Sequence, residues 1–224
     1  MLRWFAAIVA VGGVAAIAQL PADSKASTDE VVTYTAHVFM RGMKLNLPSG
    51  WTVSEDAPGE LKLAAPSGPM DGTAIGFWLD PRASAAHGVV LPHIGRTPAA
   101  LIHWLRGNSN FVVSAPATRR IAHGLLAKSV NLDLSATAPR EDPSCPGPCL
   151  TYFVIRGPGY NHEFGTGRAE PIRFYFATLR RGNTRVHTFV IDVDAPSAKA
   201  FRAVIPSAEK IVAGVRLPTK VSAG

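Results

Sequence analysis

Residues 172–193, IRFYFATLRRGNTRVHTFVIDV, are the stretch that decides the fold. Two apolar runs, 172–179 and 184–193, lie on either side of the polar residues RRGN at 180–183. Glycine and asparagine are favoured in tight hairpin turns, and aromatic and β-branched residues are favoured in strands. The sequence therefore predicts a β-hairpin in the last third of the chain.

Further strands are predicted upstream of this hairpin. Apolar and polar residues alternate over 43–47, which is the pattern of a strand with one buried face. A turn at 48–50 leads into 51–53, which we expect to begin a strand that returns beside the first, and 61–63 predicts a third short strand. Residues 72–79 (GTAIGFWL) are almost entirely apolar, as in a central strand that is covered on both faces.

Two helices are predicted. Thr97 is a favourable N-cap and Pro98 suits the first helical position, so a helix is expected over 97–107. Ser197 is expected to cap a second helix, which Pro206 should kink or divide. Several predicted strands separate these helices, which indicates an α+β fold with a mainly antiparallel sheet flanked by helices.

The other notable features between the strands are long connections. Three of them are predicted, at 81–96, 135–149 and 157–171. Connections of this length in a compact domain are commonly functional or poorly ordered.

The first residues have the pattern of an export leader. A positive charge at Arg3 precedes a long apolar run, and Ala16 and Ala18 form the small-x-small site that signal peptidase favours. We predict a signal peptide at 1–18, a flexible tether at 19–32, one globular domain at 33–218 and a tail at 219–224. Retention of the apolar run as an N-terminal anchor is the alternative. Either outcome makes the domain secreted or part of the extracytoplasmic cell envelope.

The chain is basic, with a formal net charge of +7. Positive charge is concentrated late in the sequence, and the arginines of interest there are Arg168, Arg173, Arg181 and Arg185. Such a region could bind an envelope polymer, an anionic lipid surface or an acidic protein, or could simply be a solvated surface. Nucleic acid is not an expected partner, because no nucleic-acid-binding motif is present and export removes the opportunity.

Two cysteines enclose a short turn-forming segment, Cys145-Pro-Gly-Pro-Cys149. In an exported protein this arrangement predicts a structural disulfide, which would pin a loop. The alternative, redox catalysis, needs a two-residue spacer and a helix start, and neither is present.

The sequence contains no complete catalytic or metal-binding motif, so no catalytic residue, metal site or cofactor is predicted. His162 and Glu163 lie in a glycine-rich segment and are candidate binding residues together with the arginines above. Asp80 has no evident acid–base partner, and His187 alternates within a strand as a partly exposed structural residue would.

Several segments resemble PsbP-like domains. Leu47-Pro48-Ser49-Gly50-Trp51 followed by a strand is similar to the opening of such domains, and the helices at 97–107 and 198–215 resemble their middle and final helices. The cysteine segment and the arginine-bearing strand at 173–179 are similar to uncharacterised exported proteins of high-GC Gram-positive bacteria. The resemblance covers about residues 33 to 217. It implies an α/β/α sandwich that serves as a binding or assembly module, and it brings no catalytic residues.

The leading hypothesis from the sequence is therefore a non-catalytic exported binding or assembly module of the cell envelope, with an unknown ligand and an undefined oligomeric state. The alternative is an extracytoplasmic hydrolase that uses the segments 81–96 and 157–171. Its candidate polar groups would be His87, His93, His162 and Glu163.

Overall fold

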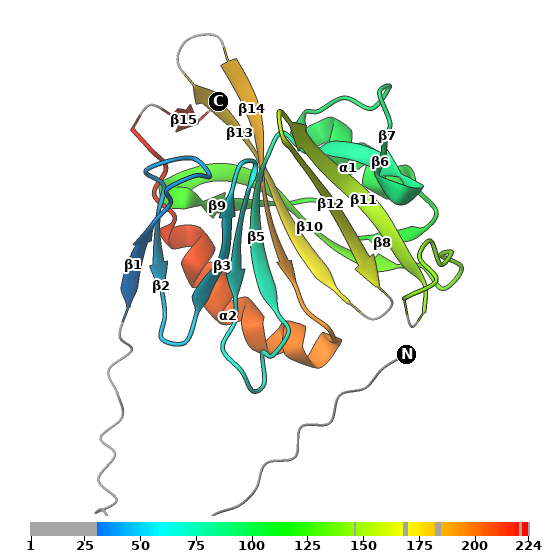
Figure 1. The fold of residues 1–224 in the computed structure, drawn as a ribbon, viewed down its shortest axis with the longest axis horizontal. Helices are drawn as coiled ribbons and strands as arrows, with labels where there is room; N and C mark the ends of the chain where they lie inside the picture. The colour runs from blue at the N-terminus through cyan, green and yellow to red at the C-terminus, as the bar shows by residue number, and fades with distance from the viewer. Residues whose placement is uncertain (1–30, 146, 168–169, 182–184, 220, 224) are drawn as a thin grey trace, which may run out of the picture.

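The fold is α+β, with a mostly antiparallel sheet and two helices, as predicted. The structure is a computed structural model that describes residues 31–145, 147–167, 170–181, 185–219 and 221–223. Within this part of the chain, a nine-stranded sheet forms the middle layer and other elements cover both of its faces (Figure 1).

The middle layer is built from antiparallel strand pairs. Its main path, in spatial order, is β3 (Thr52–Ala57), β4 (Glu60–Ala64), β5 (Ala74–Leu79), β14 (Arg185–Asp194), β13 (Ile172–Arg181), β10 (Leu125–Leu134) and β8 (Phe111–Val113). Two further strands attach to this path: β9 (Ala117–Ile121) pairs with β10, and β15 (Val221–Ala223) pairs with β13.

The predicted hairpin is confirmed as β13 and β14, which pair from Ile172 opposite Asp194 to Arg181 opposite Arg185. Alternate residues of these strands enter two different cores. Phe174 and Val190 belong to the cluster on one face of the sheet, whereas Phe189 belongs to the cluster on the other face. This explains why the two strands are apolar at almost every position. Arg180 and Arg181 of the predicted turn belong to β13, whereas Gly182 and Asn183 lie outside the described part of the chain.

Helix α2 (Ala198–Gly214) and the short strands β1 (Val32–Thr35) and β2 (Lys44–Leu47) cover one face of the sheet (Figure 1). The Ser197 hydroxyl accepts a hydrogen bond from the Ala200 amide at 3.2 Å, which confirms the predicted cap. The helix continues through Pro206, so the expectation of a division there is wrong. Buried residues before and after the proline, including Val204 and Ala208, hold both halves on the sheet.

The pairing expected for the strand at 43–47 is also wrong. Strand β2 pairs with β1, and the chain after the turn at 48–50 enters the nine-stranded sheet as β3, which pairs with β4. Trp51 is buried at this crossing between sheets. Alternation correctly predicted which side chains are buried, but it carries no information about which strand lies alongside.

The opposite face of the middle layer carries helix α1 (Pro98–Gly107) and a four-stranded sheet (Figure 1). The spatial order of that sheet is β12 (Tyr160–Gly167), β11 (Cys149–Gly157), β6 (Arg82–Ala85) and β7 (Val89–Val90). The Thr97 hydroxyl accepts from the Ala100 amide at 3.2 Å, so the cap of α1 is confirmed.

Two of the three predicted long connections contain strands instead. The segment 157–171 includes β12, which pairs with β11 from end to end, and 81–96 includes β6 and β7. Strand β12 (YNHEFGTG) was missed because it is mainly polar and contains two glycines, so it lacks the apolar alternation of a strand. The third segment, 135–149, remains a connection and leads into β11.

The predicted signal peptide and almost all of the predicted tether lie outside the described residues. Strand β1 begins at Val32, close to the predicted start of the globular domain. Among the described helices, neither is long and apolar enough to cross a membrane.

Candidate functional site

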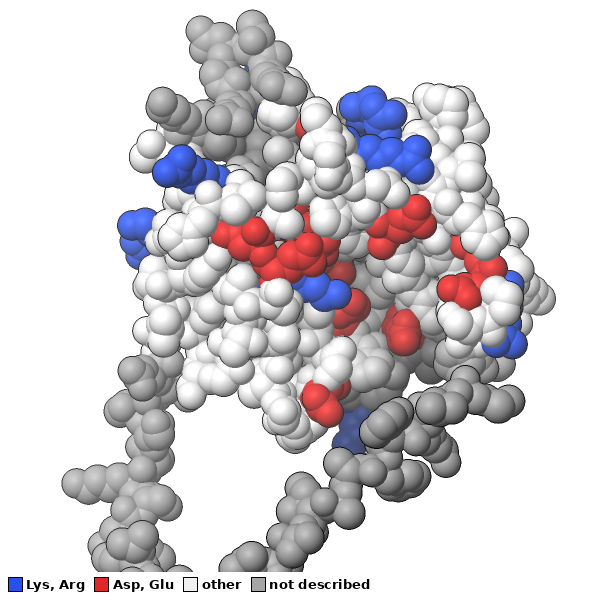
Figure 2. All heavy atoms as spheres, in the orientation of Figure 1, with Lys and Arg blue, Asp and Glu red and all other residues white. Residues whose placement is uncertain are grey.

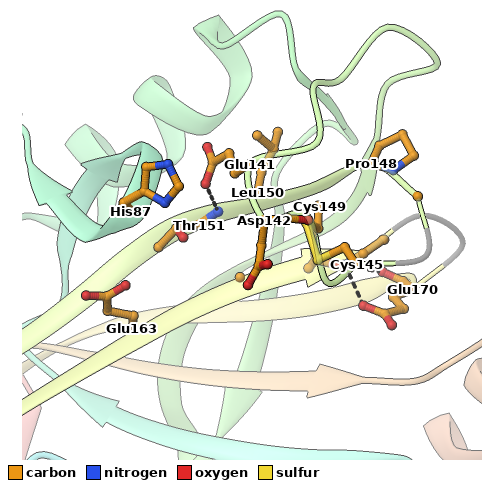
Figure 3. A pocket seen from close by; sticks show the side chains of 14 residues that line it. His87, Glu141, Asp142, Cys145, Pro148, Cys149, Leu150, Thr151, Glu163 and Glu170 are labelled. Carbon is orange, nitrogen blue, oxygen red and sulfur yellow. Dashed lines mark hydrogen bonds between the residues drawn. A yellow bond between two sulfur atoms is a disulfide. The ribbon is translucent and has the colours of Figure 1, made fainter. Parts of the chain in front are cut away.

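An acidic groove runs beside β12, on the face where Asp and Glu side chains gather in Figure 2. The groove has a volume of about 730 Å³. Figure 3 shows its ionisable side chains, which come from the β6–β7 turn, from the 135–149 connection and from the region of β12: His87, Glu141, Asp142, Glu163 and Glu170. None of the described residues that line it is lysine or arginine.

Hydrogen bonds to the backbone hold three of these carboxylates in place. Glu141 accepts from the Thr151 amide at 2.9 Å, which ties the connection to β11. Glu170 accepts from the Gly167 amide at the end of β12. Asp142 accepts from the Ser144 amide at 2.7 Å, and this bond lowers the pKa of the Asp142 carboxyl. Asp142 is therefore ionised over the whole neutral range.

The two cysteines form one edge of the groove. The sulfur atoms of Cys145 and Cys149 lie at disulfide distance, as predicted, and both residues line the groove. The Cys149 amide donates to the Pro139 carbonyl and the Glu141 amide donates to the Cys149 carbonyl, so the same short segment is joined to the start of β11. The cysteine pair therefore restrains the part of the connection that carries Glu141 and Asp142.

The opposite edge depends on a close approach of backbone to carboxylate. Gly88 has a φ of +68°, and a Cβ atom at this position would lie 2.4 Å from the Glu163 carboxyl group. Only glycine permits this backbone conformation and this proximity at the same time. The Gly88 carbonyl accepts from Arg156 Nη2 at 2.8 Å, which fixes the turn against β11. Asn161 Nδ2 donates to Glu163 at 3.2 Å and orients its carboxylate.

A smaller cavity of about 120 Å³ lies beneath the groove, and Glu163 and Gly165 line both. Asp192 lines this cavity and is only 3% exposed. Its Oδ1 atom and the Nε1 atom of Trp78 are both buried, and neither has a hydrogen-bond partner among the described residues. Burial, and secondarily the charge of Asp194, raises the pKa of Asp192 well above its usual value. Burial also raises the pKa of Asp194.

A second cluster lies at the rim of this cavity. Its possible ligand atoms, which all lie within 4.8 Å of one another, come from Glu55, Glu60 and His162. His162 Nδ1 is 3.3 Å from Glu60 Oε2, and burial followed by repulsion from Glu55 raises the pKa of Glu60. One imidazole and two carboxylates form a donor set suited to a divalent metal ion. No metal site was predicted from the sequence, because the two strands that carry the glutamates are distant in sequence from β12.

The structure separates the residues that were predicted to bind together. Glu163 lines the groove, whereas its neighbour His162 contacts Glu60. Arg173 faces α2 on the other side of the middle sheet, where its Nη1 donates to Glu209 at 2.8 Å and its Nε to Asn131 at 2.9 Å. Arg168 and the side chains of Arg181 and Arg185 lie outside the described part of the structure. Among the candidate hydrolase residues, His87 and Glu163 share the groove, and His93 is exposed in a turn.

Asp192 and Asp194 were not predicted to be site residues, although a signal for them is present in the sequence. Both are carboxylates that alternate with apolar residues in the pattern VIDVD of a central strand. A carboxylate in such a position is buried at a cost in free energy unless something compensates it. A functional role is one reason for a protein to retain it.

Comparisons with known proteins give no independent assignment. No protein-family model matches the chain, and no curated protein matches it significantly. The geometry of the groove is therefore the basis on which a function can be proposed.

Proposed function

We propose that this protein is a non-catalytic exported binding module of the cell envelope, and that its acidic groove binds a positively charged ligand. The observation that carries the proposal is the gathering of four carboxylates along one groove in a chain of net charge +7. Export rests on the leader pattern at 1–18. The resemblance to PsbP-like domains, which commonly serve as binding or assembly modules, supports the same class of function.

The chemistry of the groove favours ammonium or guanidinium groups on a flexible chain. Asp142 and Glu163 stand on different edges of the groove, so that their charges reinforce one another in the space between. Pro148, which is half-buried, adds apolar surface, against which the methylene stem of a lysine or arginine would pack. A lysine-rich or arginine-rich segment of a partner protein satisfies both requirements.

The anionic partners suggested by the arginines would not bind to the carboxylates of the groove. An envelope polymer, an anionic lipid surface or an acidic protein would have to bind at Arg168, Arg181 or Arg185, because Arg173 is already paired with Glu209. This remains a prediction.

The test is a calorimetric titration of the protein with hexalysine at low ionic strength, with hexaglutamate as the probe of opposite charge. The triple variant Asp142→Asn/Glu163→Gln/Glu170→Gln should bind hexalysine roughly tenfold more weakly. The matched control, Asp71→Asn/Asp133→Asn/Glu209→Gln, makes the same change of charge outside the groove and should bind normally. Equal weakening in both variants would show that only net charge matters, and would contradict the proposal.

The second candidate is the hydrolase, which is favoured by the position of His87 in the groove with Asp142 and Glu163. An imidazole beside carboxylates could act as a general base. The discriminating variant is His87→Asn, because His87 has a φ of +54° and asparagine tolerates that conformation. An enzyme would lose turnover of chromogenic ester or amide substrates in this variant. A binding module would show no turnover in either form and would retain hexalysine.

A further inference from the structure

A second cavity, of about 470 Å³, lies on the other face of the middle sheet and is separate from the acidic groove. It is enclosed by the segment between β1 and β2, by the ends of β5 and β13, by the start of β14 and by the residues that follow α2. Its volume is in the range of about 300–1,000 Å³ that is typical of small-molecule pockets.

The cavity combines an apolar floor with basic side chains. The apolar residues that line it are Met40, Leu79, Leu179, Leu217 and Pro218. The basic ones are Arg41, Lys44 and Arg216, all exposed and therefore able to keep their charges hydrated until a ligand binds. No described residue of the lining is acidic.

His187 adds a buried polar group to this lining. It is 7% exposed, which corrects the expectation that it is partly exposed, and its Nδ1 atom lies 2.6 Å from Asp80 Oδ2. The sequence suggested that Asp80 has no partner, but the structure pairs it with His187. Its Oδ1 atom also accepts from the Thr188 amide at 2.9 Å, so the carboxylate is fixed and holds the imidazole in one orientation.

The other ring nitrogen of His187, Nε2, is buried and has no hydrogen-bond partner in the described part of the chain. Because Asp80 occupies Nδ1, Nε2 is the ring atom that remains without a partner. A buried polar atom without a partner costs free energy, and a ligand that pairs with it recovers that cost. Among the described residues, Asp80 contacts the ring, and Arg41, Lys44 and Arg216 line the same cavity, so an anion is the complementary partner.

From this arrangement we propose that the cavity binds a single-chain amphiphile with an anionic head group. The head lies among His187, Arg41 and Arg216, and the aliphatic chain lies on the leucines of the floor. Lys44, at the start of β2, neutralises the head. This site and its ligand are independent of the acidic groove, so either proposal can fail while the other stands.

The experiment is a titration of the full-length protein with dodecanoate below its micellar concentration, followed by calorimetry. Dodecanol and dodecyltrimethylammonium have the same chain with a neutral and a positive head. Both should bind at least roughly tenfold more weakly than dodecanoate if the head-group charge is recognised. The affinity for dodecyl phosphate, compared with that for dodecanoate, shows whether a phosphate or a carboxylate head group is preferred. No binding of dodecanoate, or equal binding of dodecanol, would overturn the proposal.

Variants test whether binding occurs in this cavity. Arg41→Ser/Lys44→Ser/Arg216→Ser should weaken dodecanoate binding by roughly tenfold and leave dodecanol binding unchanged. Arg106→Ser/Arg202→Ser/Lys210→Ser changes exposed residues on the two helices by the same charge and should have no effect. Since His187 is buried and substitution there risks the fold, the ring is followed in the unmodified protein by NMR. Its imidazole resonances should shift on addition of dodecanoate. Unshifted resonances, or equal weakening in the control variant, would refute this location.

Discussion

The acidic groove and the His187 cavity carry opposite charge on opposite faces of one sheet. The groove is lined by four carboxylates and the cavity by three exposed cations, although both belong to a chain of net charge +7. The overall charge therefore says little about the sign of a particular site. The fold decides the sign of the charge at each site, because it brings together residues that are distant in sequence.

The two sites also differ in how they treat their buried polar groups. In the His187 cavity the buried imidazole has a fixed carboxylate partner, and the cations around it remain in water. In the cavity beneath the groove, Asp192 is buried with an oxygen that has no partner among the described residues. We expect the pair of His187 with Asp80 to stabilise the fold, whereas the two atoms without a partner, His187 Nε2 and Asp192 Oδ1, each destabilise it while no ligand is bound.

The largest effect is expected from Asp80→Ala. The variant removes the acceptor of the Thr188 amide and the partner of His187, and it places alanine at a φ of +55°. Loss of the hydrogen bonds to this carboxylate, together with the strain of alanine in a left-handed backbone conformation, predicts a decrease of about 3 kcal/mol in the free energy of unfolding. Guanidinium-induced unfolding measures this loss. Asp80→Asn keeps an acceptor oxygen and suits the left-handed conformation, so it should lose clearly less. Equal losses would show that the carboxylate has no special role.

A smaller effect of opposite sign is expected from Asp192→Asn. Because burial raises the pKa of Asp192 in the folded state, the folded protein binds more protons than the unfolded chain above the ordinary Asp pKa. Stability therefore falls as pH rises from about 4 through the raised pKa. The variant lacks this loss and should be more stable than wild type by about 1 kcal/mol at neutral pH.

The measurement for Asp192→Asn is urea unfolding at a series of pH values. The stability difference from wild type should disappear below about pH 3, where the carboxyl is protonated in both states. Asp133→Asn, an exposed position on β10, should show no such trend. A constant difference between Asp192→Asn and wild type at every pH would contradict the assigned burial cost.

The smallest effect is expected from Glu209→Gln, which lies in neither site. It breaks the pair between Arg173 and Glu209, and half of the Glu209 side chain is exposed. Loss of such a pair costs less than about 1 kcal/mol. Urea unfolding should show that small loss, and the affinities for hexalysine and for dodecanoate should not change. A change in either affinity would mean that the two sites are not as separate as their positions indicate.

The parts of the fold that the sequence predicted are those with local causes. The caps at Thr97 and Ser197 and the apolar strands of the central hairpin depend on neighbours in the chain. The partner of β2 and the existence of β12 were missed, because pairing is decided by distant segments. The same reason hid the sites: Asp80 and His187 are 107 positions apart in sequence, and only Glu163 was predicted among the groove carboxylates.

Strand β14 carries His187 and Asp192, and an odd separation of five positions puts them on opposite faces. Phe189 and Ile191 pack on the α2 side with His187, whereas Val190 packs on the side of Asp192. A deletion of one residue between them would reverse the faces, so that both sites could not survive it together. Substitutions can therefore alter either site alone as the sequence evolves. The number of residues between His187 and Asp192, in contrast, is a constraint that both sites share.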